Sequence, residues 1–415
     1  MSNARRVAVT GLGVVSPIGI GKDAFWKNLI AGKSGVDYIT AFDASKYPCK
    51  VAAEVKDFNP TDFLSSRKAA HMGRFSQLAV AATRLAIEDA NLSLHPSNSS
   101  NVGVFYGTSV NGGGDIAADA LLAMQHDGLQ AVRPWAALEY PPHAASSYIT
   151  IEFGITGPAV SLSSNCCTGL DVIHAGFSAI ASREATVAIV GGCDAPIFPL
   201  PFGAFCALGA VTKRNDAPTK ASRPYDSLRD GIVVAEGAAT LILEDLEVAQ
   251  ERGALIYAEI LGHGAASEAI SMRKGDLSGR TMATAIRIAI ASGGLSPTDI
   301  DHVNAHGSSL PDYDVCDSNA FKRALGDHAY NIPITSIKSM IGQPVSAAGA
   351  FQTAAACLSI QNNLVPPTIN QDSPDPKCDL DYVPNVSRTA RIRNVLLNGH
   401  SFGGSVSALV ITRTS

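Results

Sequence analysis

Short apolar runs that end in glycine recur along this chain and alternate with longer stretches of helical pattern. Such runs are RVAVTGLG, NVGVFYGTS, VAIVGGCDA, HVNAHGSS and NVLLNGHSFGG. Runs of this kind are typical of strands buried on both faces of a sheet. Between them, apolar residues recur at helical spacing over 76–90, 169–182 and 281–292. The sequence therefore predicts an α/β protein in which helices cover buried strands.

Composition narrows the classes of function. The chain has 415 residues, 46% of them hydrophobic and 17% charged, which is enough to bury a large core. Its formal net charge is -5 and it has no long run of Lys or Arg, so a nucleic-acid partner is not expected. The uncharged range 195–212 and the apolar start of the chain are interrupted by Pro and Gly, so neither a membrane span nor a signal peptide is predicted.

The cysteines bear on the redox compartment. Eight cysteines are scattered along the chain and none forms a CxxC pair, so the spacing indicates neither a zinc ribbon nor a disulfide framework. We therefore expect a reducing, cytoplasmic location, with no metal site and no cofactor.

The order of the motifs suggests an internal duplication. The first half of the chain contains, in order, NVGVFYGTS, SLSSNCCTGLDVIHAG and TVAIVGGCDA. The second half contains three similar segments in the same order: HVNAHGSSL, ITSIKSMIGQPVSAAG and NVLLNGHSFGG. This order predicts two similar βα halves, residues 1–250 and 251–415, that pack together. The alternative is a chance similarity among strands that end in glycine.

Cys166 is the candidate nucleophile. It lies in SSNCCTGL, between the end of an expected strand and a helix that begins near Gly169, a setting that exposes a nucleophile. A helix N-terminus stabilises a thiolate, so we expect the thiol pKa to lie below its usual value of about 8.5. The alternative is that Cys166 and Cys167 are both small buried core residues.

The chain resembles the β-ketoacyl-ACP synthases of fatty-acid and polyketide synthesis over nearly its whole length, and three stretches carry the resemblance most clearly. They are VAVTGLGVVSPIG, the range 213–262 and NGHSFGG. The resemblance implies the thiolase-like fold, an α/β architecture of two duplicated halves packed as five layers, α-β-α-β-α. It also implies that Cys166, rather than Cys167, carries the acyl group, because NCCTG matches the family's nucleophile motif.

The same resemblance assigns residues that handle protons and bind the pantetheine arm. The family's A-H-G-T-x-T motif matches AHGSSL, so His306 corresponds to its first catalytic histidine. Ser308 and Leu310 stand where two threonines contact the pantetheine arm. One of these two hydroxyl groups is therefore lost. The alternative for His306 is a structural role with a single backbone hydrogen bond.

Further motifs depart from the family pattern. Gln343 stands where the family has its second histidine in K-S-x-x-G-H, so it can donate an N–H but cannot carry a charge. Lys338 of this motif is retained, and Asp317 takes the place of a glutamate, so we expect a Lys338–Asp317 support pair.

The glycine-rich motif near the C-terminus also differs. Phe402 matches the family's gating phenylalanine, whose backbone N–H helps to form the oxyanion hole, and His400 replaces another phenylalanine beside the cysteine. We consider two roles for His400: a substitute for the missing imidazole, or a side chain that only fills the volume of the phenylalanine.

Together these motifs predict a condensing acyltransferase. An acyl group would pass to Cys166, and a malonyl-type extender on an acyl carrier protein would then be decarboxylated and condensed with it. The alternatives are an acyltransferase or cyclising enzyme that has lost decarboxylation, and an inactive chain-length partner subunit. Arg67, Lys68 and Arg74 are the expected docking residues for the acidic carrier, unless they are only a solvated helix face, and a homodimer or heterodimer with a related subunit is expected.

Overall fold

A computed structural model describes residues 5–110 and 115–414. Its central feature is an eleven-stranded sheet in which the strands follow the order β11-β10-β14-β15-β9-β1-β8-β7-β5-β6, with β2 paired to β1. Residues 7–245 supply β1 and the strands on one side of it, and residues 258–412 supply β9 and the strands on its other side. Each half of the chain therefore forms one arm of the sheet.

The two arms have the same pattern of strand directions. In the first arm, β1 pairs with β8 and β8 with β7 in antiparallel fashion. The next two pairs, β7 with β5 and β5 with β6, are parallel. Outward from β9, the strands β15, β14, β10 and β11 repeat this pattern. The first arm contains β1 (Val7–Ser16), β2 (Gly19–Ile20), β5 (Val102–Gly107), β6 (Ala159–Leu162), β7 (Val187–Asp194) and β8 (Gly237–Asp245). The second contains β9 (Ala258–Ser267), β10 (His302–Asn304), β11 (Ile334–Thr335), β14 (Asn394–His400) and β15 (Ser405–Thr412).

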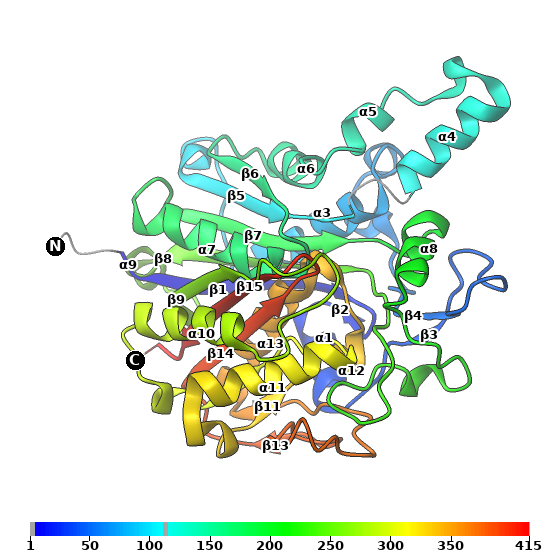
Figure 1. Ribbon diagram of the computed structural model, residues 1–415. Helices are drawn as coiled ribbons and strands as arrows, with labels where there is room; N and C mark the ends of the chain where they lie inside the picture. The colour runs from blue at the N-terminus through cyan, green and yellow to red at the C-terminus, as the bar shows by residue number, and fades with distance from the viewer. Residues whose placement is uncertain (1–4, 111–114, 415) are drawn as a thin grey trace.

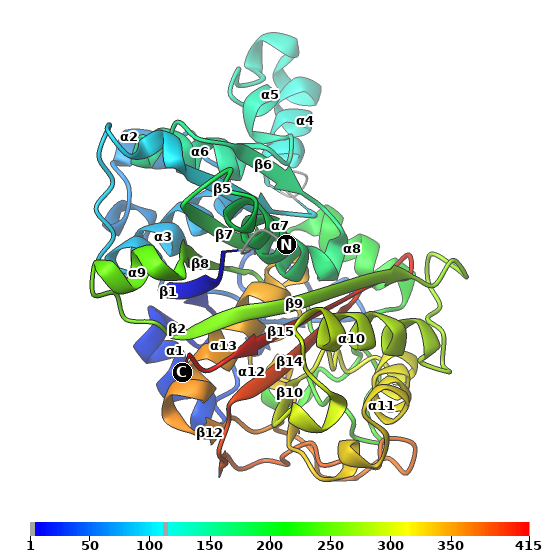
Figure 2. The same cartoon turned by 90° about the vertical axis from the view of Figure 1, so that its left-hand side faces the viewer.

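Helices form the remaining layers. α7 (Thr168–Ala181) and α13 (Ala348–Asn362) contact each other and strands of both arms, whereas α3 (Arg74–Asp89) covers the first arm and α10 (Arg280–Ser292) the second. The resulting five-layer α-β-α-β-α arrangement can be followed in Figures 1 and 2. The fold prediction is confirmed, and the three helices expected from periodicity begin and end within two residues of α3, α7 and α10. The boundary expected near residue 250 lies at the end of α9 (Leu246–Glu251), and the division into two domains stays a prediction.

The other elements are short or peripheral. Figures 1 and 2 both show α4 (Asp115–Asp127) and α5 (Ala136–Glu139) projecting from the body of the molecule. None of the described helices is long and apolar enough to cross a membrane. The remaining helices are α1 (Lys22–Ile30), α2 (Ser66–Ala69), α6 (Ala144–Phe153), α8 (Pro199–Leu208), α11 (Pro311–Leu325) and α12 (Lys338–Ile341). Two small hairpins pair β3 (Asp37–Tyr38) with β4 (Val51–Ala52) and β12 (Leu364–Val365) with β13 (Arg388–Thr389).

Glycines allow the two central helices to meet. A Cβ added to Gly169 of α7 would lie 2.6 Å from the backbone nitrogen of Ala350, and one added to Gly349 of α13 would lie 2.5 Å from that of Leu170. Both distances are shorter than van der Waals contact, so only glycine fits at either position. The contact brings the first turns of α7 and α13 together, and the residues just before these turns carry the candidate chemistry.

Gly349→Ala tests this contact. The added methyl group must push apart two backbones inside a packed core, so we expect a loss of about 1–3 kcal/mol in the free energy of unfolding. Urea denaturation measures it. Gly203→Ala in α8 is the matched control, because its Cβ would meet only the Tyr47 ring, at 3.4 Å. Equal stability of the two variants would show that the glycine contact does not constrain the helices.

Candidate active site

Cys166 lies on a tight turn between β6 and α7. Asn165, Cys166 and Cys167 form a short 3-10 turn, and Asn165 adopts a left-handed backbone conformation with φ 57°. A non-glycine residue in this region is uncommon and marks a constrained turn. The turn places Cys166 on the wall of a cavity, with 6% of its surface exposed.

Cys167 has a different environment. It is fully buried, its backbone N–H donates to the Ser401 hydroxyl at 3.0 Å, and its thiol donates to the Ser405 carbonyl at 3.2 Å. It therefore anchors the loop after β14 and is not among the residues that line the cavity. The structure distinguishes the two cysteines as the motif comparison expected.

The expected lowering of the Cys166 pKa is wrong. Burial raises the pKa of this thiol to about 12, and the negative charge of Asp194 acts in the same direction. The positive charge of Lys338 and the local backbone N–H favour the thiolate but do not offset the burial. The helix N-terminus identified from sequence is present, but desolvation outweighs its field. The sulfur therefore carries its proton at neutral pH.

His306 is held as a neutral donor. The backbone N–H of His400 donates to its Nδ1 at 3.3 Å, and an N–H can only donate, so the imidazole proton lies on Nε2. Burial, followed by the charges of Lys338 and His400, lowers the pKa of His306 well below its ordinary value. His306 lines the cavity with Cys166, so it can offer a hydrogen bond to an oxygen there.

Lys338 is buried and oriented by the backbone. Its Nζ donates to the His306 carbonyl at 2.7 Å and to Gln352 Oε1 at 3.4 Å. Burial lowers the pKa of the ammonium group to about 8, against the opposing effect of Cys166 and of nearby carboxylates. Lys338 thus joins the loop of His306 to the first turn of α12.

The expected Lys338–Asp317 pair is not among the ion pairs of the described residues. Asp317 instead accepts hydrogen bonds from Gly307 N at 2.8 Å, Asn398 Nδ2 at 2.9 Å and the Tyr225 hydroxyl at 3.1 Å. These donors satisfy the carboxylate, and its side chain is one methylene shorter than the glutamate of the family. Asp317 therefore supports the His306 loop directly, without an ion pair to Lys338.

Gln343 lies opposite Cys166. Its side-chain amide Nε2 donates to Cys166 Sγ at 3.6 Å, while its Oε1 is buried and has no hydrogen-bond partner. The backbone of Gln343 is held on both sides by Val233 and Ala235. The amide N–H can therefore donate a hydrogen bond to an acceptor that lies beside the Cys166 sulfur.

The cavity around these groups is narrow. Its volume is about 10 Å³, which is room for about one water molecule. An acyl chain therefore cannot enter unless a lining side chain moves. The lining residues are Asn165, Cys166, Phe205, Ile232, His306, Ser308, Leu310, Tyr313, Gln343, Val345, His400 and Phe402.

His400 ends β14, and Phe402 lies on the loop that follows it and lines this cavity. Phe402 is half-buried, and its ring packs edge-on against Tyr313 at 5.7 Å between centroids. The His400 ring lies 6.2 Å from that of His306, but its Nε2 approaches Glu268 Oε1 at 3.1 Å. Among the contacts of the described residues, none joins the His400 ring to Cys166.

Ser308 and Leu310 lie on the wall where the pantetheine arm was expected. The Ser308 backbone N–H donates to Asp314 at 2.9 Å, and its hydroxyl accepts from the Leu310 N–H at 3.4 Å. Leu310 packs against an apolar cluster that includes Ile232 and Phe202. This wall has one hydroxyl and one apolar side chain, as the motif comparison indicated.

The predicted docking patch is smaller than expected. Arg74 is not a free cation, because its guanidinium donates to both oxygens of the buried Glu236 carboxylate, at 2.6 and 2.7 Å. Lys68 is half-exposed and forms an ion pair with Glu152 at 2.6 Å. Arg67 is exposed. The positive charge of Arg74 is therefore already paired, as is that of Lys68, and the docking role of all three residues stays a prediction.

Sequence reasoning missed two residues beside the site. Asp194, at the end of β7, is fully buried and accepts hydrogen bonds from Thr108, Ser109, Val110 and Ser346, which ties the segment after β5 to the turn before α13. A polar residue directly after a buried strand was the available signal. Tyr313, which packs on Phe402 and His400, gave no signal in its α11 sequence.

Comparisons with known proteins identify the family of the chain. Residues 4–249 match the family model "Beta-ketoacyl synthase, N-terminal domain" and residues 257–372 match "Beta-ketoacyl synthase, C-terminal domain". The chain belongs to the β-ketoacyl synthase family. It is a condensing enzyme of the 3-oxoacyl-ACP synthase type, an acyltransferase.

Relatives include enzymes of both fatty-acid and polyketide type. A 3-oxoacyl-[acyl-carrier-protein] synthase 2 from Coxiella burnetii is 41% identical over 99% of both chains. The tetracenomycin polyketide synthase ketoacyl synthase alpha subunit from Streptomyces glaucescens is 39% identical over 99% of this chain and 97% of its own. A solved type II polyketide ketosynthase in complex with its acyl carrier protein has a TM-score of 0.92, with 34% identity and full coverage of both chains.

The raised Cys166 pKa predicts a distinctive pH dependence of alkylation. Iodoacetamide reacts with the thiolate, and the pKa is about 12. The rate at Cys166 should therefore rise about tenfold per pH unit between about pH 7 and 9 without a plateau, because the thiolate fraction rises in this way well below the pKa. Peptide mass spectrometry locates the adduct, and Cys166→Ala is the control. A plateau below about pH 8 would instead indicate the stabilised thiolate expected from sequence.

Proposed function

We propose that Cys166 carries the acyl group and that His306 and Gln343 stabilise the charge that develops during decarboxylative condensation. The observation that carries this proposal is the convergence of three groups on one narrow cavity: the Cys166 thiol, the neutral His306 and the Gln343 amide. They come from the turn before α7, the loop after β10 and the turn after α12. The set is thus Cys-His-Gln in place of the family's Cys-His-His.

Loading of the enzyme is a thioester exchange. The Cys166 sulfur attacks the acyl carbonyl of an acyl carrier thioester, the bond from that carbonyl to the carrier sulfur breaks, and the Cys166 proton ends on the departing thiol. Because the thiol pKa is about 12, the proton leaves as the new bond forms and not beforehand. The backbone N–H groups of Cys166 and Phe402 are the proposed oxyanion donors in this step.

Condensation needs donors and no charged base. The carboxylate of a malonyl-type extender leaves as CO₂, and the electron pair of that C–C bond becomes the enolate. The enolate carbon attacks the Cys166 thioester, and the released thiolate takes up a proton. The enolate oxygen needs N–H donors, which His306 Nε2–H and Gln343 Nε2–H can supply without a change of charge. Gln343 can therefore serve in this step although it cannot relay a proton.

The partners follow from the same proposal. A carrier protein would present its acyl and malonyl groups past Ser308, Leu310 and the half-buried Phe402, which must move to admit them. β6 is the end strand of the sheet, and Ala159 and Val160 on it are exposed, so we propose pairing with a second copy or a related subunit along this edge. We also propose a reducing, cytoplasmic location, which the eight free cysteines support.

Two measurements distinguish condensation from the two alternative functions. An acyltransferase or cyclising enzyme without decarboxylation would be acylated at Cys166 but would release no CO₂ from a malonyl carrier. A chain-length partner subunit would not be acylated. Intact mass after incubation with acyl carrier, together with measured CO₂ release, separates these outcomes from condensation.

Cys166→Ala should abolish acyl loading, whereas Cys167→Ala should retain most of it. Only the Cys166 sulfur lines the cavity, and Cys167 is bonded to the loop at Ser401 and Ser405. Intact mass with an acyl carrier thioester measures loading. A loaded Cys166→Ala variant would refute the assignment, and circular dichroism of both variants controls for misfolding.

Gln343→Met keeps the length of the side chain but removes its N–H donor. Loss of one such donor lowers the rate of related steps by about 10²–10³, so CO₂ release should fall by about that factor while acyl loading falls less. Gln343→His restores a donor and should recover most of the rate.

His400→Phe is the comparison for the competing role of this imidazole. Because the ring approaches Glu268 and not Cys166, CO₂ release should fall by far less than the 10² or more expected on losing an acid/base group. If His400→Phe abolishes CO₂ release and Gln343→Met does not, the two residues have the opposite roles. Acyl loading is measured separately in both.

Arg67→Glu should raise the carrier KM, chiefly at low salt, because an exposed cation that faces an acidic partner acts through screened electrostatics. Lys68→Glu should change it less, since Lys68 already pairs with Glu152. Steady-state rates at low and high salt provide both values. An unchanged KM for both variants at low salt would exclude this surface.

A further inference from the structure

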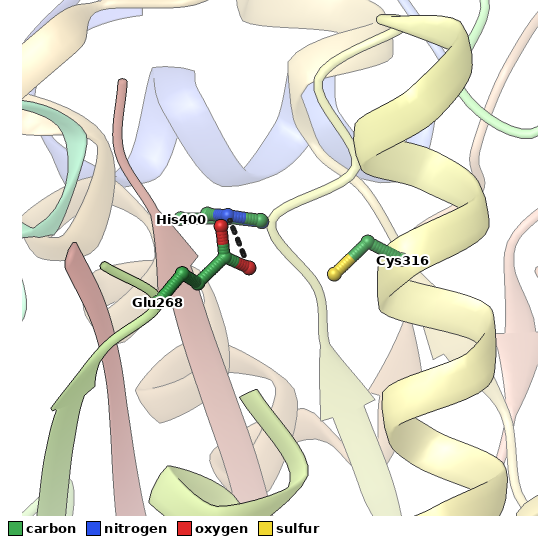
Figure 3. Close-up of side chains that lie close together, drawn as sticks. All are labelled: Glu268, Cys316 and His400. Atoms are coloured by element: carbon green, nitrogen blue, oxygen red, sulfur yellow. Dashed lines mark ion pairs between the residues drawn. The ribbon is translucent and has the colours of Figure 1, made fainter. Parts of the chain in front are cut away.

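A buried group of three side chains lies close to the loop that carries Phe402. Its members are Glu268, Cys316 and His400. Glu268 follows β9, His400 is the last residue of β14, and Cys316 lies within α11, so three elements from different parts of the chain converge (Figure 3). All three residues are buried, and one ligand atom from each lies within 4.8 Å of the others. No spacing in the sequence predicts this group.

The hydrogen bonding of this group is incomplete. Both carboxylate oxygens of Glu268 and both ring nitrogens of His400 are buried without a hydrogen-bond partner. His400 Nε2 and Glu268 Oε1 are only 3.1 Å apart, yet their orientation is not that of a hydrogen bond. Their side chains are 0% and 1% exposed, respectively, and Glu268 has no other ion-pair partner among the described residues. An anion buried in this way costs several kcal/mol unless a cation compensates it.

We propose that Glu268, Cys316 and His400 bind a divalent transition metal ion of the Zn²⁺ class. An imidazole nitrogen, a thiolate sulfur and a carboxylate oxygen form a mixed set that suits Zn²⁺, whereas Mg²⁺ and Ca²⁺ prefer oxygen ligands only. Zinc bonds of about 2.0–2.3 Å place ligand atoms about 3–4 Å apart, so the group must close by about 1 Å. Water would complete the tetrahedron.

Charge balance supports this choice of ion. Binding displaces the Cys316 proton to solvent, and the thiolate together with the Glu268 carboxylate then neutralises a divalent cation, while His400 stays neutral. The metal would satisfy the unpartnered oxygens of Glu268 and one ring nitrogen of His400. The two negative ligands therefore balance the charge of the ion, and no further charged residue is needed.

The ion would link the loop that carries Phe402 to its neighbours. Glu268 N donates to the Gly404 carbonyl at 2.8 Å and Gly403 N donates to the Met272 carbonyl at 3.0 Å, so the 268–272 segment already runs beside the loop. A metal would join both segments to α11. If Phe402 gates the cavity, a point that rests on the proposed function, metal binding restricts that movement.

Cobalt substitution tests the site in the full chain. After removal of metals with a chelator, one equivalent of Co²⁺ should bind per chain and give a near-ultraviolet thiolate-to-cobalt charge-transfer band together with the visible bands of tetrahedral Co²⁺. Cys316→Ser should lose the charge-transfer band. Cys357→Ser is the matched control and should keep it, because Cys357 is equally buried, in the α13 core, and takes no part in the group.

Two further variants keep the result interpretable. Glu268→Gln should weaken Zn²⁺ binding by at least about tenfold, and Zn²⁺ should raise the Tm of the parent chain but not that of Cys316→Ser. Cys166→Ala should retain the cobalt band, so this test is independent of the proposed catalytic role of Cys166. A parent chain that binds no Co²⁺, or a band that persists in Cys316→Ser, would overturn the proposal and leave Glu268 and His400 as a buried pair.

Discussion

The contact between Gly169 and Gly349 is the constraint on which the site depends. It sets the first turns of α7 and α13 against each other between the two arms of the sheet. Cys166 lies just before the first of these turns and Gln343 a few residues before the second. Residues separated by 177 positions therefore face each other at 3.6 Å. A larger side chain at either glycine would separate the nucleophile from its donor.

A buried polar network holds the remaining groups around this contact. Asn398 accepts from the His306 backbone N–H and donates to Asp317, and Asp317 accepts from Gly307. Lys338 holds the His306 carbonyl from the other side. The two buried charges of this network, Asp317 and Lys338, are thereby hydrogen-bonded, which limits the cost of placing a carboxylate and an ammonium group in the core. The network fixes the backbone of the His306 loop, and the His400 N–H that donates to Nδ1 fixes the tautomer of the ring.

The sequence predicted the fold and the members of the site better than it predicted their electrostatics. Strands and helices followed from periodicity because their apolar faces are buried against several layers. Cys166, His306, Gln343 and Phe402 followed from motifs, and they do share one cavity. The pKa of Cys166, the partners of Asp317 and the ion pair of Arg74 depend on burial and on contacts between distant segments. A linear motif does not contain that information, and the same reason hid Asp194 and the Glu268–Cys316–His400 group.

The exchange of histidine for glutamine changes which states of the site are charged. A buried histidine opposite Cys166 would need a proton to act as an acid, and burial opposes this proton as it does in His306. Glutamine offers the same kind of N–H donor at every pH and has no charged form to desolvate. The enolate oxygen needs a donor but not a formal charge, so a neutral pair of donors is sufficient for that step. In the proposed mechanism, Gln343 cannot move a proton from that side of the cavity, so the proton that leaves Cys166 would travel with the departing thiol.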